Sequence, residues 1–222
     1  MSILEILGIS DESDQTSAPA HKVVTGEIIS FTPDVALVKL SDSSEAILPI
    51  SEYFPDQKFQ VGVRFQMLLL NGASRPVCSV VRPELVEALY AGVVPEMRTG
   101  LVRIMSVARS AGVRSKVAVA ITSDSPVDPV AALIGKDANR VNLVRSLLGG
   151  ERIDIVAWHI DPEVYLVNAL APARVSRVEV TDRGATVYAP SHQMSAAVGA
   201  GGLNSQLAGQ LLGLPVVVVP ER

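Results

Sequence analysis

The sequence predicts a multidomain protein in which a small all-β barrel precedes two α+β domains of one design. Two observations predict this architecture. Five short strand-like runs with turn residues between them fill the region from residue 21 to residue 83. Beyond Pro83 the pattern becomes helix, two strands, two helices and a final strand, and this order occurs twice. The 222 residues therefore divide into three small domains.

Composition narrows the class of protein. The net charge is -4, from 19 Lys and Arg against 23 Asp and Glu, and no segment is a strongly basic nucleic-acid patch. Cys78 is the single cysteine, which suits a reducing compartment and excludes a disulfide framework. The start lacks the basic residues of a secretion signal, and the apolar runs are far shorter than the ~20 residues of a membrane span. We therefore expect a soluble, cytoplasmic protein that binds no membrane.

Residues 1–20 are expected to hold a short helix and a linker. The helix is predicted from Ile3, Leu4, Ile6 and Leu7, and either docks on a partner or folds back on its own chain. Residues 11–20 are polar and acidic, as linkers are. The barrel is expected over residues 21–83, and its strand-like runs are residues 22–31, 35–40, 45–50, 63–70 and 76–81.

The first α+β domain is expected over residues 84–157 and the second over residues 158–222. In the first, helices are predicted over 83–92, 128–135 and 139–150, with strands over 101–109, 115–121 and 152–158. In the second, helices are predicted over 161–172, 191–199 and 203–213, with strands over 174–180, 185–190 and 215–219. Asp128 and Asp161 each precede a proline, the pattern of a capping side chain before the first helical residue. The final strand of the first domain runs through Trp158 without a flexible spacer, so we expect a rigid tandem anchored by Trp158.

Each α+β domain contains a four-residue turn between two helices. The two turns are Gly135-Lys136-Asp137-Ala138 and Gly199-Ala200-Gly201-Gly202. A GxxG turn can bind phosphate, because it aims backbone N–H groups and the positive end of the next helix where no side chain blocks approach. KH domains clamp about four nucleotides of single-stranded nucleic acid in this way. Glycines end many helices, but here the motif occupies the same place in both repeats, and this strengthens the prediction.

Several stretches carry a resemblance to a known family. They are "GVRSKVAVAI", "DPVAALIGKDANRV", "LLGGERIDIVAW", "DPEVYLVNALAPARV" and "AAVGAGGLNSQLAGQLLG". These stretches resemble the tandem type II KH region of the bacterial transcription factor family NusA, and the barrel looks like the family's S-one-type OB domain. The resemblance spans roughly residues 22–219. It implies binding of single-stranded RNA along the barrel and both KH domains, and a role in transcription elongation, pausing, termination and antitermination.

The sequence also departs from that family. The family usually has both glycines in each turn and a lysine in the second turn, so Ala138 and Ala200 are departures. Asp137 adds a negative charge beside Lys136, and its repulsion of a phosphate is worth about 1 kcal/mol. The family usually begins with a helical domain that contacts RNA polymerase, whereas only residues 1–20 precede the barrel here. We therefore expect weaker binding to polymerase, although RNA polymerase or other transcription factors stay possible partners.

The candidate RNA-binding residues come from the turns and from matching positions elsewhere. Four basic residues have two interpretations, contact with RNA or ordinary surface: Lys136, Arg140, Arg114 and Lys116. Asn204 either bonds a base or caps its helix, and Phe31 is either a stacking platform or a packed turn aromatic. The predicted site is Gly135, Lys136, Asp137, Ala138, Asn139, Arg140, Gly199, Ala200, Gly201, Gly202, Asn204, Arg114, Lys116 and Phe31.

Catalysis finds little support in the sequence. His21, His159 and His192 have no metal-ligand spacing, and no nucleophile, Walker or Rossmann motif is present. We expect no enzyme activity, cofactor, metal or small-molecule substrate. Two functions stay open: an RNA-binding transcription factor, or a protein-interaction module derived from a NusA-like tandem whose RNA binding has decayed.

Overall fold

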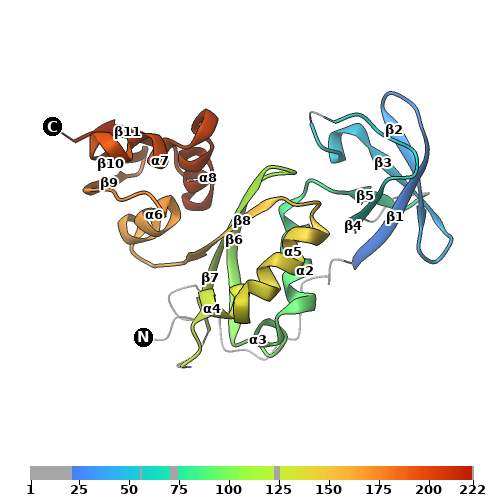
Figure 1. Ribbon diagram of the computed structural model, residues 1–222, viewed down its shortest axis with the longest axis horizontal. Coiled ribbons are helices and arrows are strands. Elements are labelled where there is room, and N and C mark those ends of the chain that lie inside the picture. The colour runs from blue at the N-terminus through green and yellow to red at the C-terminus, as the bar shows by residue number, and fades with distance from the viewer. Residues whose placement is uncertain (1–21, 56, 71–74, 123–125, 222) are drawn as a thin grey trace.

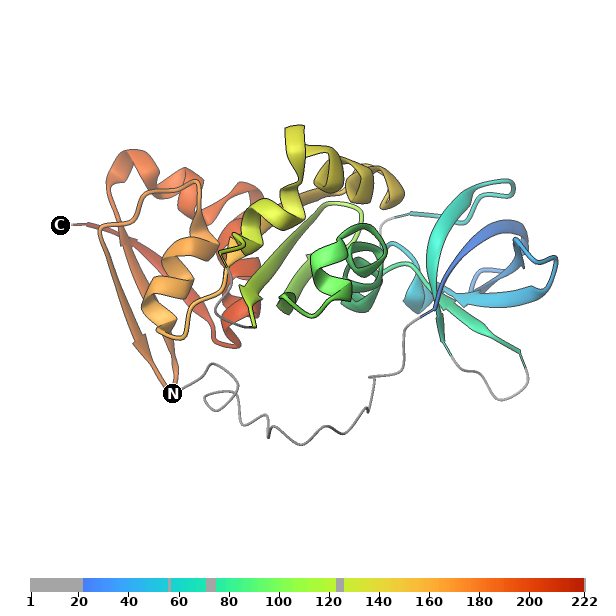
Figure 2. The same cartoon turned by 90° about the horizontal axis from the view of Figure 1, so that it is seen from below.

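The computed structural model describes residues 22–221 apart from residues 56, 71–74 and 123–125. The helix and linker predicted over residues 1–20 lie outside the described residues. The barrel, the first α+β domain and the second α+β domain follow one another along the molecule (Figure 1), and a view turned by 90° shows the same order (Figure 2). Among the helices described, none combines the length and apolar character that crossing a membrane requires.

The barrel contains five strands, as predicted. They are β1 (Lys22–Phe31), β2 (Val35–Leu40), β3 (Glu45–Pro49), β4 (Arg64–Leu70) and β5 (Val77–Ser79), with the short helix η1 (Ile50–Glu52) after β3. The strands close in the order β1-β2-β3-β5-β4, with β4 antiparallel to β1. Alternate side chains fill the interior, among them Ile28 and Val38, which are fully buried. Gly26 is required there, because a Cβ would lie 2.4 Å from Cγ1 of Val38.

The first α+β domain has a three-stranded sheet covered by helices. Its elements are α2 (Pro83–Val93), α3 (Pro95–Arg98), β6 (Val102–Ser110), β7 (Arg114–Ile121), α4 (Pro129–Ile134), η2 (Lys136–Ala138), α5 (Asn139–Leu147) and β8 (Arg152–Ala157). The sheet order is β6-β7-β8, with β7 antiparallel to β6 and parallel to β8. The predicted cap is present, because Oδ1 of Asp128 accepts a 2.8 Å bond from the Val130 amide. The sequence analysis missed α3, which starts at a proline as helices often do.

The second α+β domain repeats this plan. Its elements are α6 (Pro162–Leu170), β9 (Arg177–Thr181), β10 (Gly184–Ala189), η3 (Ser191–Gln193), α7 (Met194–Val198), η4 (Ala200–Gly202), α8 (Leu203–Leu212) and β11 (Val216–Pro220). The sheet order is β11-β10-β9, with β10 antiparallel to β9 and parallel to β11. Oδ1 of Asp161 accepts a 2.9 Å bond from the Glu163 amide, so the same cap starts α6.

The sheet of the first α+β domain is buried on both faces. Val117 and Val119 of β7 belong to the domain's own core, together with Leu133 of α4. Ala118 points to the opposite face and packs in a core with Leu166 and other residues of the second domain. The second domain therefore covers the face of β7 that the helices of the first domain leave open. This explains why β7 is apolar throughout its middle.

The two α+β domains share this core, and the rigidity of the tandem stays a prediction. Trp158 packs in the shared core, partly buried, and its amide donates a 2.9 Å bond to the Val119 carbonyl. A polar contact crosses the same junction, where the hydroxyls of Ser106 and Tyr165 lie 3.0 Å apart. The anchoring role predicted for Trp158 agrees with this position.

A buried ion pair organises the junction between the barrel and the first α+β domain. Arg109 of β6 and Glu151 before β8 contact each other at 2.9 Å, with side chains 1% and 0% exposed. Glu151 also accepts bonds from the Gly112 amide at 2.8 Å and from the Ser115 hydroxyl. Arg109 in turn donates from Nη1 to the carbonyl of Arg82, which leads from the barrel into α2. One carboxylate thus fixes the β6–β7 turn and the chain segment that enters from the barrel.

Candidate nucleic-acid interface

The two predicted turns begin with glycines in the same backbone conformation. Gly135 has φ 74° and ψ 168°, and Gly199 has φ 78° and ψ 168°. This region of backbone space is essentially restricted to glycine. Neither position has room for a side chain either, because a Cβ would lie 2.3 Å from Oδ1 of Asn139 in the first turn and 2.6 Å from Cβ of Asn204 in the second. The first glycine of each turn therefore has a structural role.

We expect Gly199→Ala to lower the free energy of unfolding more than Gly201→Ala does. At Gly201, with φ 59° and ψ 19°, alanine costs about 1–2 kcal/mol and its Cβ meets open space. Gly199 lies in the region essentially restricted to glycine, where the strain is about 1–3 kcal/mol. At Gly199 the clash with Asn204 adds at least about 1–3 kcal/mol of overpacking. Urea unfolding of both variants checks this difference, and equal losses would show that close packing at Gly199 does not matter.

The third and fourth turn positions also match between the domains. Their φ values are 53° and 58° at Asp137 and Ala138, against 59° and 79° at Gly201 and Gly202. The second turn has glycine at both of these positive-φ positions, whereas the first holds an aspartate and an alanine in the left-handed region. Aspartate tolerates that region better than alanine does.

The residue five positions after each first glycine ties the two helices around the turn together. Nη1 of Arg140 donates a 2.6 Å bond to the carbonyl of Ala132, and Nδ2 of Asn204 donates a 3.2 Å bond to the carbonyl of Ala196. Each acceptor lies three residues before its glycine, at the end of a short helix whose last carbonyls lack helical partners. Arg140 and Asn204 are therefore equivalent in the two repeats, and both fix the turn.

These contacts change the interpretation of both residues. Asn204 is 1% exposed, and its amide also donates to the Leu170 and Ala197 carbonyls. Neither reading of Asn204 from the sequence was right, because the buried side chain reaches no surface and Gly202 occupies the cap position. Arg140 is partly exposed, and its guanidinium is also paired with Glu96 at 2.9 Å. Contact between Arg140 and phosphate stays a prediction.

The outer side of each turn is open. A Cβ at Gly201 or Gly202 would have no neighbour within 4 Å, and Lys136 and Asp137 are exposed. The first amides of a helical turn have no acceptor within it, and they point outward with the positive end of the helix dipole. Both turns thus offer backbone donors at an approachable surface, followed by helices of nine and ten residues. This arrangement can bind an anionic group such as a phosphate.

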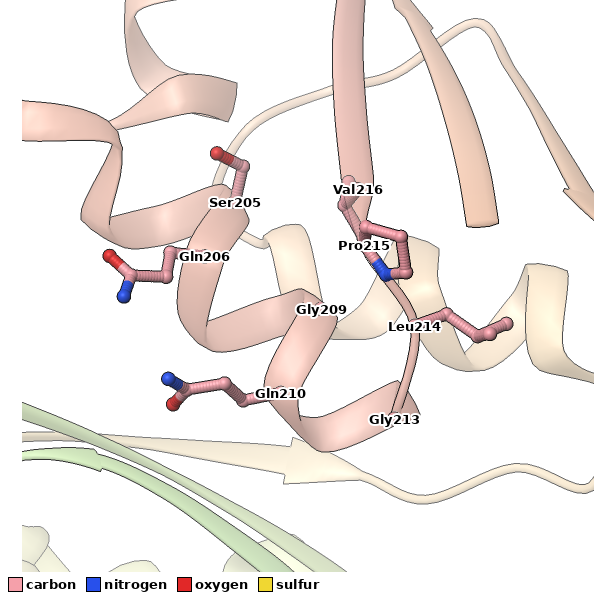
Figure 3. Close-up of a pocket in the computed structure, with 8 residues that line it drawn as sticks. All are labelled: Ser205, Gln206, Gly209, Gln210, Gly213, Leu214, Pro215 and Val216. Carbon is pink, nitrogen blue, oxygen red and sulfur yellow. The ribbon is translucent and has the colours of Figure 1, made fainter. Parts of the chain in front are cut away.

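A groove lies along α8 and the start of β11 (Figure 3). It has a volume of about 480 Å³, and Ser205, Gln206, Gln210 and Val216 are among its lining residues. Gly209 allows the narrow spacing of helix and strand, because a Cβ there would lie 2.7 Å from the carbonyl oxygen of Leu214. A strand held at the turn can continue along this neutral groove.

The first domain has a different residue at the corresponding position. Ten residues after the first glycine stands Arg145 in place of Gly209, and its Nε donates a 3.3 Å bond to the carbonyl of Gly150. Arg145 is exposed. The position that holds Gly209 in the second domain therefore carries an exposed cation in the first.

Arg114 and Lys116 do not lie on an open surface as predicted. Lys116 is 0% exposed, and its Nζ lies 3.1 Å from Oδ2 of Asp154, which also accepts bonds from Arg114. Burial lowers the pKa of Lys116, with Asp154 opposing the shift. Burial alone would raise the pKa of Asp154, but Lys116 and Arg114 hold it below its usual value. The reading of Lys116 as exposed surface was wrong, because the second domain covers this face of the sheet.

Phe31 lies at the end of β1, far along the chain from both turns. It is 49% exposed, and its ring centroid is 6.0 Å from that of Phe59. The structure thus places the predicted residues in separate groups: Gly135 to Arg140 around the first turn, Gly199 to Asn204 around the second, Arg114 and Lys116 behind the first sheet, and Phe31 on the barrel.

Sequence reasoning missed three features that shape the interface. They are the carboxylates of Glu151 and Asp154, which pair with four basic side chains, and the pair Gln206 and Gln210 on α8. The spacing of the two glutamines, four residues on a predicted helix, placed them on one face and was the available signal. Apart from Arg152, which lies two residues before Asp154, the partners of the carboxylates are 36 to 42 residues distant in sequence, so no local pattern shows them.

A five-stranded barrel followed by two α+β domains, each with a four-residue turn between helices that begins with glycine, defines a tandem KH protein, although Ala138 replaces the second glycine of the first turn. The description "NusA-like first KH domain" matches residues 81–158, and "NusA-like second KH domain" matches residues 162–221. The chain belongs to the NusA family. The α+β domains are hereafter the first and second KH domains.

Relatives named "Transcription termination/antitermination protein NusA" agree with this assignment. The chain is 37% identical to that of Bacillus subtilis over 184 residues, covering 80% of this chain and 49% of the relative. It is 40% identical to that of Thermus thermophilus over 180 residues, covering 78% and 46%. It is 37% identical to that of Halalkalibacterium halodurans over 185 residues, covering 80% and 48%. The chain spans about half the length of these curated relatives.

Proposed function

We propose that this chain binds single-stranded RNA through its two KH turns and acts in transcription elongation, termination or antitermination. The observation that carries the proposal is the matching conformation of the turns. Asp137 and Ala138 keep the positive φ values that Gly201 and Gly202 have, although neither residue favours them. A turn needed only to connect helices has no reason to hold alanine in a strained backbone conformation, whereas an anion clamp needs that direction of its amides.

The two turns contribute different parts of the clamp. In the second, the absence of side chains lets a phosphate approach the amides of Ala200 and Gly201. In the first, Lys136 supplies a positive charge at the exposed surface. Asp137 beside it repels a phosphate, which offsets about 1 kcal/mol of the attraction by Lys136. The shared core between the KH domains holds the two turns at a fixed separation, so one strand meets both without ordering the protein first.

The proposal extends to partners and compartment. The relatives are named for transcription termination and antitermination, and we infer that RNA polymerase or other transcription factors are further partners in a cytoplasmic, non-catalytic role. Within the described residues, no three His, Cys, Asp or Glu side chains are grouped so that they could hold a metal ion.

A protein-interaction module is the second candidate. The observation that favours it is the pairing of three basic side chains with carboxylates of the same chain, namely those of Arg114, Lys116 and Arg140. The net charge of -4 favours it too. Because these basic side chains are already paired, RNA binding would depend on backbone N–H donors and on few free charges.

Fluorescence anisotropy with single-stranded and duplex RNA of one sequence separates these candidates. We expect single-stranded RNA to bind more tightly, with micromolar or weaker affinity. The logarithm of the binding constant should fall with the logarithm of salt concentration with a slope of about -2 to -3.5, which corresponds to roughly three to five phosphates. Equal or tighter binding of the duplex contradicts the clamp, and no binding at low salt favours the interaction module.

A further inference from the structure

A cleft lies where the barrel and both KH domains meet. It has a volume of about 430 Å³ and is lined from three sides: by residues 50, 51, 53 and 55 of the barrel, by residues 109–111 at the end of β6, and by α8 of the second KH domain. Because each side comes from a different domain, the cleft exists only in the assembled three-domain unit. Its size lies within the usual range for sites that bind small organic groups.

The cleft adjoins the groove beside the second turn. Gln206 and Gln210 line both hollows, so the two hollows meet along α8. Figure 3 shows both side-chain amides on the side of α8 turned away from Val216. The two glutamines stand one helical turn apart on an exposed face, so both can address one ligand. A strand that leaves the groove across α8 enters the cleft directly.

The chemistry of the cleft selects a neutral ligand. Among the described residues that line it, Arg109 alone is charged, and its guanidinium is engaged by Glu151 and by the carbonyl of Arg82. The remaining polar groups are hydroxyls and amides, among them Ser51 and Ser110, next to apolar surface such as Ile50. The described lining residues offer a phosphate no free cation, and they offer a charged peptide no unpaired opposite charge. A flat group with hydrogen-bonding edges suits these walls.

We propose that this cleft is a nucleobase-binding subsite, which takes a base of the single-stranded RNA after the strand passes the second KH turn. Glutamine amides present a donor and an acceptor together, the combination that reads the edge of an unpaired base. The apolar wall covers the face of the base. The subsite rests on the proposed RNA binding and adds base selectivity to a clamp that recognises only backbone.

The walls of the cleft are held before any ligand arrives. The Arg109–Glu151 pair fixes the end of β6, and Glu52 pairs with Arg82 at 2.6 Å beside the barrel loop. α8 is fixed on the opposite side, because Leu207 is buried in the core that the two KH domains share. A preformed cleft discriminates between bases without a conformational step.

Base selectivity can be tested with equal-length oligouridylate, oligoadenylate and oligocytidylate, and with an abasic oligomer of the same length. Ser51→Trp fills the cleft from the barrel side and does not touch the groove between α8 and β11. Ser44→Trp is the matched control, since Ser44 is exposed at the other end of β3. We expect Ser51→Trp to weaken the best homopolymer about tenfold, to leave the abasic oligomer unchanged, and to reduce the differences among bases. Ser44→Trp should match the wild type.

A second experiment, photo-crosslinking, locates the bound base directly. Oligouridylate with 4-thiouridine should form photo-crosslinks to peptides containing residues 50–55 or 109–111, and Gln206→Ala with Gln210→Ala should reduce both these crosslinks and the base preference. The subsite is overturned if Ser51→Trp binds RNA like the wild type with unchanged base preference, or if the crosslinks are confined to other regions. Either result leaves the proposed KH clamp intact. Failure of the wild type to bind any of the oligomers overturns the proposed function, and the subsite with it.

Discussion

Glu151→Gln should lower the free energy of unfolding by about 3–5 kcal/mol, because it leaves the buried Arg109 guanidinium without its counter-charge. Both side chains are at most 1% exposed, and Arg109 contacts the carboxylate through Nε and Nη2 at 2.9 Å each. Glutamine keeps the size of the side chain, so the loss reports charge and hydrogen bonding instead of a cavity. Denaturant unfolding followed by circular dichroism measures it.

Glu52→Gln is the matched control for this prediction. Glu52 pairs with Arg82 at 2.6 Å, but Arg82 is 45% exposed in its side chain, so water solvates the charge that remains. Exposed pairs are worth about 0–1 kcal/mol. Similar losses in the two variants would contradict the special role of the buried pair at the junction between the barrel and the first KH domain.

Asp137→Asn combined with Ala138→Gly should tighten binding of single-stranded RNA about tenfold. Asparagine keeps the left-handed conformation and the size of Asp137 but removes the charge beside Lys136, which is worth about 1 kcal/mol. Glycine at 138 suits φ 58° and removes the methyl group, which clears the surface where a phosphate approaches. Together these effects approach the 1.4 kcal/mol that corresponds to a decade in affinity.

Anisotropy with one single-stranded RNA measures this gain, with each single variant tested beside the double variant. Asn142→Gly is a suitable control, since Asn142 is exposed on α5 and lies outside the turn. If the double variant binds no better than the wild type, the first turn does not approach the RNA.

The sequence predicted the architecture because the features that define it are local. Strand-like runs separated by turn residues gave the barrel, and the repeated order of helices and strands gave both KH domains. The turns followed from their glycines, and their matching backbone angles confirm that they are two copies of one structure. The exact domain limits at residues 83/84 and 157/158 stay predictions.

The side-chain roles were harder to predict, because they depend on contacts between distant segments. Lys116 looked exposed in a strand-edge motif, but α6 and α8 of the second KH domain cover that face of β7. Arg140 looked free, but Glu96 lies 44 residues before it in the sequence. Asn204 became interpretable only when its amide was seen at the carbonyls of α7 and of Leu170. The pattern of a basic residue after a glycine turn does not reveal whether that residue contacts a ligand or the turn itself.

The affinity of Gly202→Asp for single-stranded RNA tests the central claim most directly, namely that the KH turns clamp the RNA backbone. Aspartate tolerates positive φ, and a side chain at Gly202 meets open space, so the fold should be kept. Gly62→Asp in the barrel is the matched control, with φ 84°, open surroundings and the same added charge. We predict that Gly202→Asp weakens binding at least about tenfold while Gly62→Asp changes it little. Equal affinities of both variants and the wild type would contradict the account and make the turns simple helix connections.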